Sequence, residues 1–164
     1  MNILETERLI LRQINTDDAE FMLSLLNEPD WIKYIGDRGI QTVEAAKQYI
    51  QDGPMTMYEE HGIGLYLVEL KESETPIGIC GLIQRDFLKD VDLGFAIGSK
   101  YWGCGYAFEA ANATLTYGTI LGKRSYFSEL HSNISHCLVI YSKQSNVFGC
   151  RSKLNITFFY HSQF

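Results

Sequence analysis

Residues 93–111 read LGFAIGSKYWGCGYAFEAA. A strand-like run that ends at Ile97 leads into two glycines, Gly103 and Gly105, and an alanine-rich run typical of a buried helix begins directly after them. The first N–H groups of a helix have no partner within it, and the helix dipole adds partial positive charge there. Such a junction is typical of a phosphate-binding turn, and also of a tight strand–helix turn without a ligand.

Outside this segment, the spacing of apolar residues predicts further strands and helices. Asn15 or Thr16 and, later, Thr42 are suitable helix N-caps, and Gly53–Pro54 predicts the end of the second helix. We expect strands over Arg8–Ile14, Gly64–Leu70, Ile77–Gln84 and Val91–Ile97, and helices over residues 16–27, over Thr42–Gln51, and from Gly105 to near Gly118 or Gly122.

The order of these elements predicts the fold class. Three consecutive strands joined by polar turns are typical of an antiparallel meander, and the helices before and after them must cover its faces. We therefore expect an α+β fold, a mixed and mostly antiparallel twisted sheet flanked by helices. The 164 residues are enough for one domain, predicted over residues 1–164.

Bulk composition excludes several classes of function. The formal net charge is -6, and no cluster of Lys or Arg suits a nucleic acid or an anionic membrane. The four cysteines are scattered, so we expect neither a metal site nor a disulfide framework. The first residues lack the apolar run of a signal peptide, and no apolar stretch approaches about 18 residues. We expect a cytoplasmic protein with no nucleic-acid or membrane partner.

The same glycine-containing segment resembles the acetyl-CoA loop of GNAT acetyltransferases, in particular the ribosomal-protein-type (RimJ/RimL-like) branch. Residues 6–12, TERLILR, and 76–82, PIGICGL, resemble the opening and central strands of that family, so the resemblance covers residues 4 to about 123. The family string Tyr-Trp-Gly-x-Gly-Tyr-Ala-x-Glu-Ala is matched here by Tyr101, Trp102, Gly103, Gly105, Tyr106, Ala107, Glu109 and Ala110.

The resemblance implies a GNAT-like sheet and acetyl-CoA as the acyl-donor co-substrate. The backbone of the glycine turn would bind the diphosphate, and the preceding strand would bind the pantetheine arm as an added strand. Cys104 and Phe108 replace the basic and small hydroxyl residues that are more usual in the family. The residues implied for donor binding are Phe95, Ala96, Ile97, Trp102, Gly103, Cys104, Gly105, Tyr106, Ala107 and Phe108.

Catalysis in such a family is the direct attack of a neutral amine on the thioester, in a ternary complex. The backbone N–H of Ile97 is the expected donor to the thioester oxygen. Asp92 is the first candidate for the base, and a solvated carboxylate at a strand start is its structural alternative. Glu109 is interpreted as a helix-dipole partner or packing anchor.

Three residues are candidates for binding the acceptor: Arg8, Trp31 and Tyr34. The aromatic pair has an alternative role in the hydrophobic core. Substrate choice is expected in the loops at residues 31–39 and 85–90. The acceptor is expected to be a protein N-terminus or a small-molecule amine, and the protein a possible homodimer.

After about Arg124 the resemblance ends. The family's Pro-Asn-Asn-x-x-Ser turn is missing, and only residues 153–158 are similar to its last strand. If the reading frame is shifted by one nucleotide, the codons possible between Ser142 and Phe148 can encode that string, which indicates a reading-frame slip. The alternative is a divergent C-terminal unit over residues 125–164. The predicted function is accordingly N-acetyl transfer, with a catalytically impaired acyl-CoA-binding or interaction module as the alternative.

Overall fold

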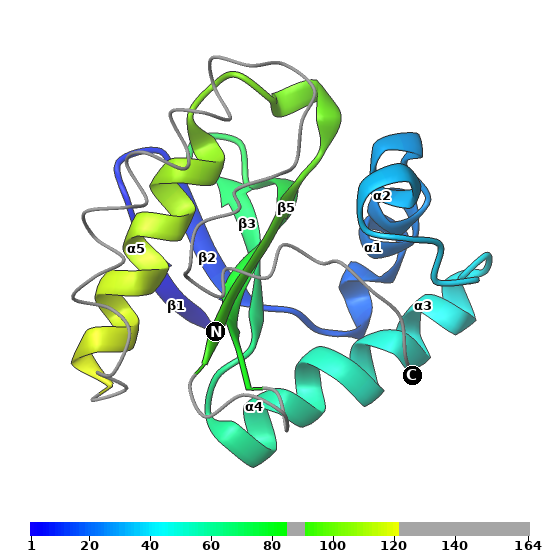
Figure 1. Ribbon diagram of the computed structural model, residues 1–164, viewed down its shortest axis with the longest axis horizontal. Coiled ribbons are helices and arrows are strands. Elements are labelled where there is room, and N and C mark those ends of the chain that lie inside the picture. Colours follow the sequence, from blue (N-terminus) through cyan, green and yellow to red (C-terminus); the bar gives the residue numbers. More distant parts are fainter. Residues whose placement is uncertain (85–90, 122–164) are drawn as a thin grey trace.

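The computed structural model describes residues 1–84 and 91–121, which form a five-stranded sheet with helices on both faces (Figure 1). The strand order follows the chain, and every neighbouring pair is antiparallel. The predicted meander and the α+β class are confirmed. The strands are β1 (Asn2–Glu5), β2 (Leu9–Gln13), β3 (Leu65–Leu70), β4 (Thr75–Ile83) and β5 (Asp92–Ile97).

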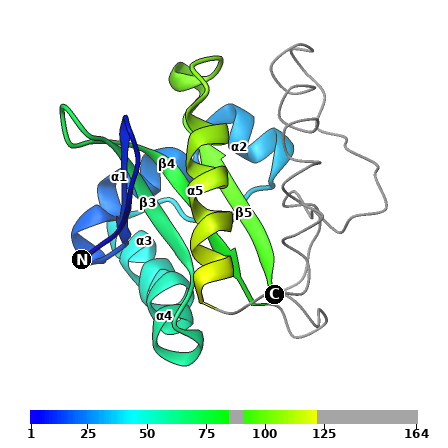
Figure 2. The same cartoon turned by 90° about the vertical axis from the view of Figure 1, so that its left-hand side faces the viewer.

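The helices divide between the two faces of the sheet (Figures 1 and 2). Helix α5 (Tyr106–Ile120) covers one face. Helices α1 (Ala19–Leu26), α2 (Pro29–Tyr34) and α3 (Val43–Ile50) lie on the other. Short helical turns occur at Thr16–Asp18 and Ser99–Tyr101. Within the described part of the chain, no helix has the length and apolar character that a membrane span requires.

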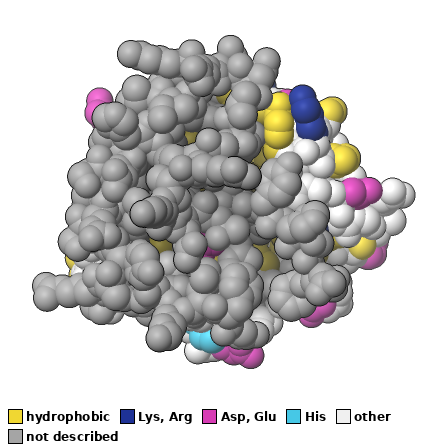
Figure 3. Space-filling model, in the orientation of Figure 1, with side chains coloured by type: hydrophobic (Ala, Val, Ile, Leu, Met, Phe, Trp, Pro, Cys, Tyr) yellow, Lys and Arg dark blue, Asp and Glu magenta, His cyan; other side chains and the backbone are white. Residues whose placement is uncertain are grey.

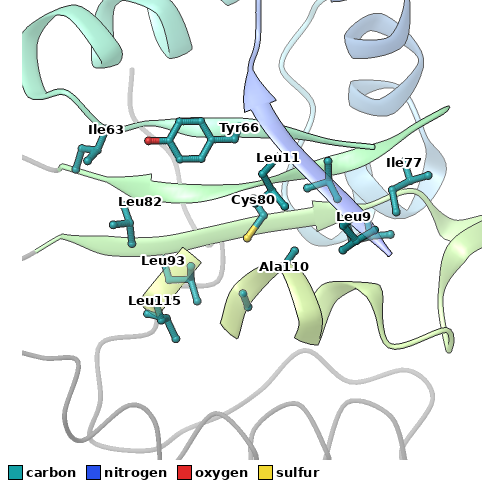
Figure 4. Packing of buried hydrophobic residues seen from close by; sticks show 13 residues of the cluster. Leu9, Leu11, Ile63, Tyr66, Ile77, Cys80, Leu82, Leu93, Ala110 and Leu115 are labelled. Carbon is teal, nitrogen blue, oxygen red and sulfur yellow. The ribbon is translucent and has the colours of Figure 1, made fainter. Parts of the chain in front are cut away.

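Each face of the sheet has its own hydrophobic core. On the α5 side, apolar residues of β2 to β5 pack against Ala110, Ala111 and Leu115 (Figure 4). Alanines on the helix allow it to approach the sheet closely. On the other side, Leu67 and Ile79 pack against α1, α2 and α3, with Trp31 among the buried residues. Because side chains alternate along a strand, β3, β4 and β5 each contribute to both cores.

Two short elements and one helix end were not predicted from the sequence. Strand β1 has only four residues, and α2 only six. Pro29 occupies the first turn of α2, where its fixed φ is favourable and its missing N–H is no loss.

The predicted helix end at Gly53–Pro54 is wrong. The chain widens into a π-helical turn (Gln51–Met55) and continues as α4 (Thr56–His61). Pro54 has no N–H to donate, and a wider turn accommodates it without ending the helix. The backbone N–H of Thr56 donates to the carbonyl oxygen of Gln51, and the Thr56 hydroxyl donates to the same oxygen at 2.9 Å.

Arg12 connects the sheet to the first helical turn. Its guanidinium donates to Asp18 at 2.7 and 2.8 Å and to Glu69 at 2.8 and 3.0 Å. The Arg12 side chain is 22% exposed and both carboxylates are less exposed still, so this is a half-buried ion network. Arg12 therefore has a structural role and fixes β2 and β3 to the turn before α1.

Gly81 in β4 provides a test of sheet packing. A Cβ atom at this position would clash with the backbone carbonyl of Gly64, and backbone cannot move aside cheaply. We expect Gly81→Ala to lower the free energy of unfolding by about 2–3 kcal/mol or more, measured by chemical denaturation. Gly53→Ala is the control, because no described atom lies within 4 Å of its Cβ position and alanine favours helix. Equal stability of the two variants would contradict this packing.

Candidate active site

The junction between β5 and α5 is built on two left-handed residues. Gly103 has φ +78° and Gly105 has φ +82°. No described atom lies within 4 Å of a Cβ placed on Gly103, and the nearest to one on Gly105 is Arg8 Nη2 at 3.5 Å. Space is therefore available at both positions, and the backbone dihedral is what requires glycine there.

Helix α5 begins directly after Gly105, which is its N-cap. The N–H of Glu109 donates to the carbonyl oxygen of Gly105 at 3.1 Å. The N–H groups of Tyr106, Ala107 and Phe108 therefore precede the first full turn of helical bonding. They collect at the positive end of a fifteen-residue helix, in the arrangement that the sequence predicts for an anion site.

Strand β5 is the last strand of the sheet in the described part of the chain. The backbone N–H and C=O groups of every second residue along it point away from β4. The N–H of Gly98 donates to the carbonyl oxygen of Ile77 at 2.8 Å, which makes this a hydrogen-bonded pair. Because such pairs alternate along an antiparallel ladder, the register turns the N–H and C=O groups of Leu93, Phe95 and Ile97 outward. This edge has the geometry that pairing with an added strand requires.

The aromatic residues of the turn fold back onto this edge. The Nε1 atom of Trp102 donates to the outward carbonyl oxygen of Ile97 at 2.6 Å. The rings of Tyr101 and Tyr106 meet edge to face, with centroids 6.5 Å apart. The glycine turn and the end of β5 are thus held side by side.

Arg8, the residue directly before β2, is bound to this turn. Its Nε donates to Glu109 Oε2 at 2.7 Å, its Nη1 donates to the carbonyl oxygen of Cys104 at 3.0 Å, and its guanidinium lies 4.6 Å from the ring centroid of Tyr106. The Arg8 backbone N–H and the Thr6 hydroxyl both donate to Glu109 Oε1, at 2.9 and 2.6 Å. Glu109 is therefore a tertiary anchor, as one of its two interpretations expects.

The structure separates the two residues predicted to be catalytic. Asp92 and Ile97 are the first and last residues of β5. Five residue steps of extended chain amount to roughly 16 Å, so the two cannot both contact one thioester. Asp92 is only 3% exposed, which makes the interpretation as a solvated carboxylate wrong. By alternation its side chain lies on the α1–α3 face together with Ala96, while Leu93 and Phe95 belong to the α5 face.

The predicted acceptor residues lie apart from one another. Arg8 is on the α5 side, at the glycine turn, whereas Trp31 and Tyr34 belong to α2. Trp31 is 4% exposed and packs in the core between the sheet and α1–α3, so its alternative role fits the structure. The loop at residues 85–90 and the segment 125–164 lie outside the described residues.

Glu28 is a site residue that sequence reasoning did not find. Its Oε2 accepts from the N–H of Ser99 at 2.9 Å, which joins the start of α2 to the end of β5. The two residues are 71 positions apart, and a Glu before Pro29 indicates only a helix start. No local pattern could have indicated the contact.

Comparison with known proteins agrees with this geometry. The family model described as "Acetyltransferase (GNAT) domain" matches residues 8–143. The chain belongs to the GNAT acetyltransferase family. The GNAT match extends past Arg124, where the sequence alone predicts that the resemblance ends.

Individual GNAT relatives are similar over most of the chain. The uncharacterized N-acetyltransferase YoaA of Bacillus subtilis (strain 168) is 32% identical over 118 residues, which are 71% of this chain and 66% of YoaA, slightly less than two thirds. A GNAT-family acetyltransferase from Bacillus anthracis superposes with a TM-score of 0.59 at 27% identity, over 75% of this chain and 69% of that one.

A third relative shows the fold alone. The RimL ribosomal L7/L12 alpha-N-protein acetyltransferase, solved in complex with coenzyme A, has a TM-score of 0.66 at 12% identity, over 84% of this chain and 82% of that one.

The pH dependence of stability tests the anchor at Glu109. Burial opposes ionisation of this carboxyl, but the bonds from Thr6 and Arg8 outweigh it, so its pKa lies below the ordinary value of 4.5. The anchor therefore stabilises the fold above about pH 4.5, and this contribution is lost as the pH falls through the lowered pKa. We expect Glu109→Gln to cost about 1 kcal/mol of unfolding free energy at pH 7, and a vanishing amount at acid pH.

Denaturation of both proteins from pH 7 to pH 3 measures this difference. Glu59→Gln, at an exposed position of α4, is the control and should follow the parent protein throughout. A cost of Glu109→Gln that is the same at every pH would show that ionisation of Glu109 contributes nothing.

Proposed function

We propose that this chain transfers an acetyl group from acetyl-CoA to a primary amine by direct attack. The observation that carries the proposal is the pair of left-handed glycines that opens α5 beside the outward edge of β5. One feature suits a diphosphate and the other suits an amide-containing arm, and coenzyme A has both. Membership of the GNAT family supports the same chemistry.

The donor site that we propose uses mostly backbone atoms. The N–H groups of residues 105–108 would bind the diphosphate, and the outward groups of Phe95 and the outward N–H of Ile97 would bind the pantetheine arm. When bound, acetyl-CoA supplies an acetyl thioester that an amine can attack. Cys104 and Phe108 are exposed and apolar in character, so they add no charge to the diphosphate site but leave its amides in place.

The length of the arm indicates which end of β5 is catalytic. Ile97 is bonded to Trp102 of the turn and so lies next to the diphosphate site. The pantetheine arm is about as long as four extended residues, roughly 13 Å. Four residues back from Ile97 is Leu93, whose N–H also points outward. We therefore reassign the donor to the thioester oxygen from Ile97 to Leu93, and Ile97 to arm binding.

This arrangement favours Asp92 as the base. It is adjacent to Leu93, and its side chain lies on the opposite face of the sheet from α5. A carboxylate there would accept the proton that the acceptor's ammonium group must lose to become the attacking neutral amine, directly or through water. The buried position keeps bulk solvent from the carboxylate.

The acceptor is proposed as a cationic amine, either a protein N-terminus or a small molecule. Acidic side chains lie around the described part of the face in Figure 3, in agreement with the formal charge of -6. The ribosomal-protein (RimJ/RimL-like) branch is proposed on the loop motif, with Tyr34 of α2 near the acceptor. A cytoplasmic location and a possible homodimer remain predictions.

A second function has one observation in its favour. Residues 144–164 lie beyond the family match, and the family's Pro-Asn-Asn-x-x-Ser turn is missing from the sequence after Arg124. A chain that lacked the family's C-terminal groups could bind acyl-CoA without transferring the acetyl group. Release of free thiol from acetyl-CoA in the presence of an amine panel, measured together with calorimetric binding, separates the two functions. Binding with turnover supports the transferase, and binding without turnover supports the binding module.

Substitution of Gly105 tests the diphosphate site. Valine is strongly disfavoured at φ +82°, so we expect Gly105→Val to displace the turn and weaken acetyl-CoA binding at least tenfold in calorimetry. Gly62→Val is matched to it, because Gly62 is also left-handed, with φ +67° and no described atom within 4 Å of its Cβ position. That variant should lose similar stability and keep its affinity. Unchanged affinity of Gly105→Val for acetyl-CoA would exclude the proposed diphosphate site.

Substitution of Asp92 tests the base. We expect Asp92→Asn to lower kcat by about 10²–10⁴-fold, because proton acceptance is removed while the donor site is kept. The KM for acetyl-CoA should change less than about threefold. Glu44→Gln, an exposed acid in α3, is the control for charge alone. A kcat of Asp92→Asn equal to that of the parent would show that Asp92 is not the base.

A further inference from the structure

The carbonyl of Cys104 has an unusual partner for a residue of a phosphate-binding turn. It accepts a hydrogen bond from Arg8 Nη1 at 3.0 Å, and Arg8 lies 96 positions away, directly before β2. A trans peptide directs its C=O and the following N–H to opposite sides. Fixing the Cys104 carbonyl toward Arg8 therefore directs the N–H of Gly105 away from it, toward the open side of the turn.

Arg8 is itself held in place by Glu109. All three guanidinium nitrogens have partners within the chain: Nε and Nη2 contact Glu109 Oε2 at 2.7 and 2.6 Å, and Nη1 contacts Cys104. Glu109 lies in the first turn of α5 and receives a second set of bonds from Thr6 and the Arg8 backbone. The planar guanidinium thus joins the glycine turn, the helix and β2 in a single bonded unit.

We propose that Arg8 and Glu109 act together as positioning residues for the donor site, and that Arg8 does not bind the acceptor. Arg8 orients the Cys104–Gly105 peptide, and Glu109 orients Arg8. Arg8 also neutralises the carboxylate of Glu109, which would otherwise repel a diphosphate bound one helical turn away. This inference rests on the proposed function, because it assigns the two residues to the acetyl-CoA site.

The positioning role differs from direct contact with a phosphate in a measurable way. If Arg8 contacted the diphosphate, removing the acid at 109 would free the guanidinium and strengthen binding. If Arg8 acts through the turn, removing the acid releases Arg8 and weakens binding. The signs of the two outcomes are opposite.

Calorimetric titration with coenzyme A tests the inference in four variants: Arg8→Met, Arg8→Lys, Glu109→Gln and the double variant Arg8→Met/Glu109→Gln. We expect Arg8→Met to weaken binding about tenfold and Glu109→Gln about threefold or more. The double variant should bind more weakly than the parent but no more weakly than Arg8→Met, because the residues form one unit and the double variant also removes the carboxylate that Arg8→Met leaves unpaired. Arg8→Lys keeps the charge but cannot supply the planar set of donors, so its affinity should stay below that of the parent.

Kinetics and stability separate positioning from a general loss of structure. In Arg8→Met we expect a raised KM for acetyl-CoA, with the KM for the amine and the kcat at saturation retained. Lys71→Met removes another exposed cation, one that pairs with Glu5 at 3.1 Å, and should leave coenzyme A affinity unchanged. Thermal unfolding of each variant identifies any that fail to fold. If Arg8→Met does not fold, the affinity of Arg8→Lys for coenzyme A takes its place in the test.

Three results would overturn the inference: tighter binding in Glu109→Gln, parental affinity in Arg8→Met, or a change confined to the KM for the amine. Failure of the proposed function is distinct from these, because the parent protein itself would then not bind coenzyme A.

Discussion

The two left-handed glycines between β5 and α5 are the constraint on which the rest of the site depends. At φ +78° and +82° the chain reverses within a few residues, so the end of a strand and the start of a helix lie side by side. The amides of the first helical turn and the outward groups of the strand edge are thereby brought into one region. Either feature alone is common in proteins, and their combination suits a ligand that carries both a diphosphate and an extended amide arm.

The surrounding fold supports this junction from two sides. On the α5 side, Arg8 and Thr6 hold Glu109, and small residues of the helix pack closely against the sheet. On the other side, Glu28 binds the backbone after β5 and so connects α2 to the same junction. The donor site is therefore supported by residues that are distant in sequence, whereas the groups that would contact the donor are nearly all backbone. Such a site tolerates exchange of side chains like Cys104 and Phe108 as long as its glycines are kept.

Much of the fold could be predicted from sequence because its signals are local. Alternation indicated the three-strand meander, the family motif indicated the turn, and the N-cap at Thr42 was correct. The continuation through Pro54 was missed because a π-helical turn depends on how the following residues pack. The partners of Arg8 and Glu28 were missed because each contact spans 71 or more positions. The distance between Asp92 and Ile97 required no tertiary information, since both lie in one strand, and the prediction that joined them neglected the length of an extended chain.

The most direct test of the central claim is an amide-resolved titration of the ¹⁵N-labelled protein with coenzyme A, followed by nuclear magnetic resonance. The account predicts that the largest shifts belong to the amides of Gly105, Tyr106, Ala107 and Phe108, followed by those of Leu93, Phe95 and Ile97 along β5. Binding that leaves the amides at the start of α5 unshifted, with changes confined to other parts of the chain, would contradict it.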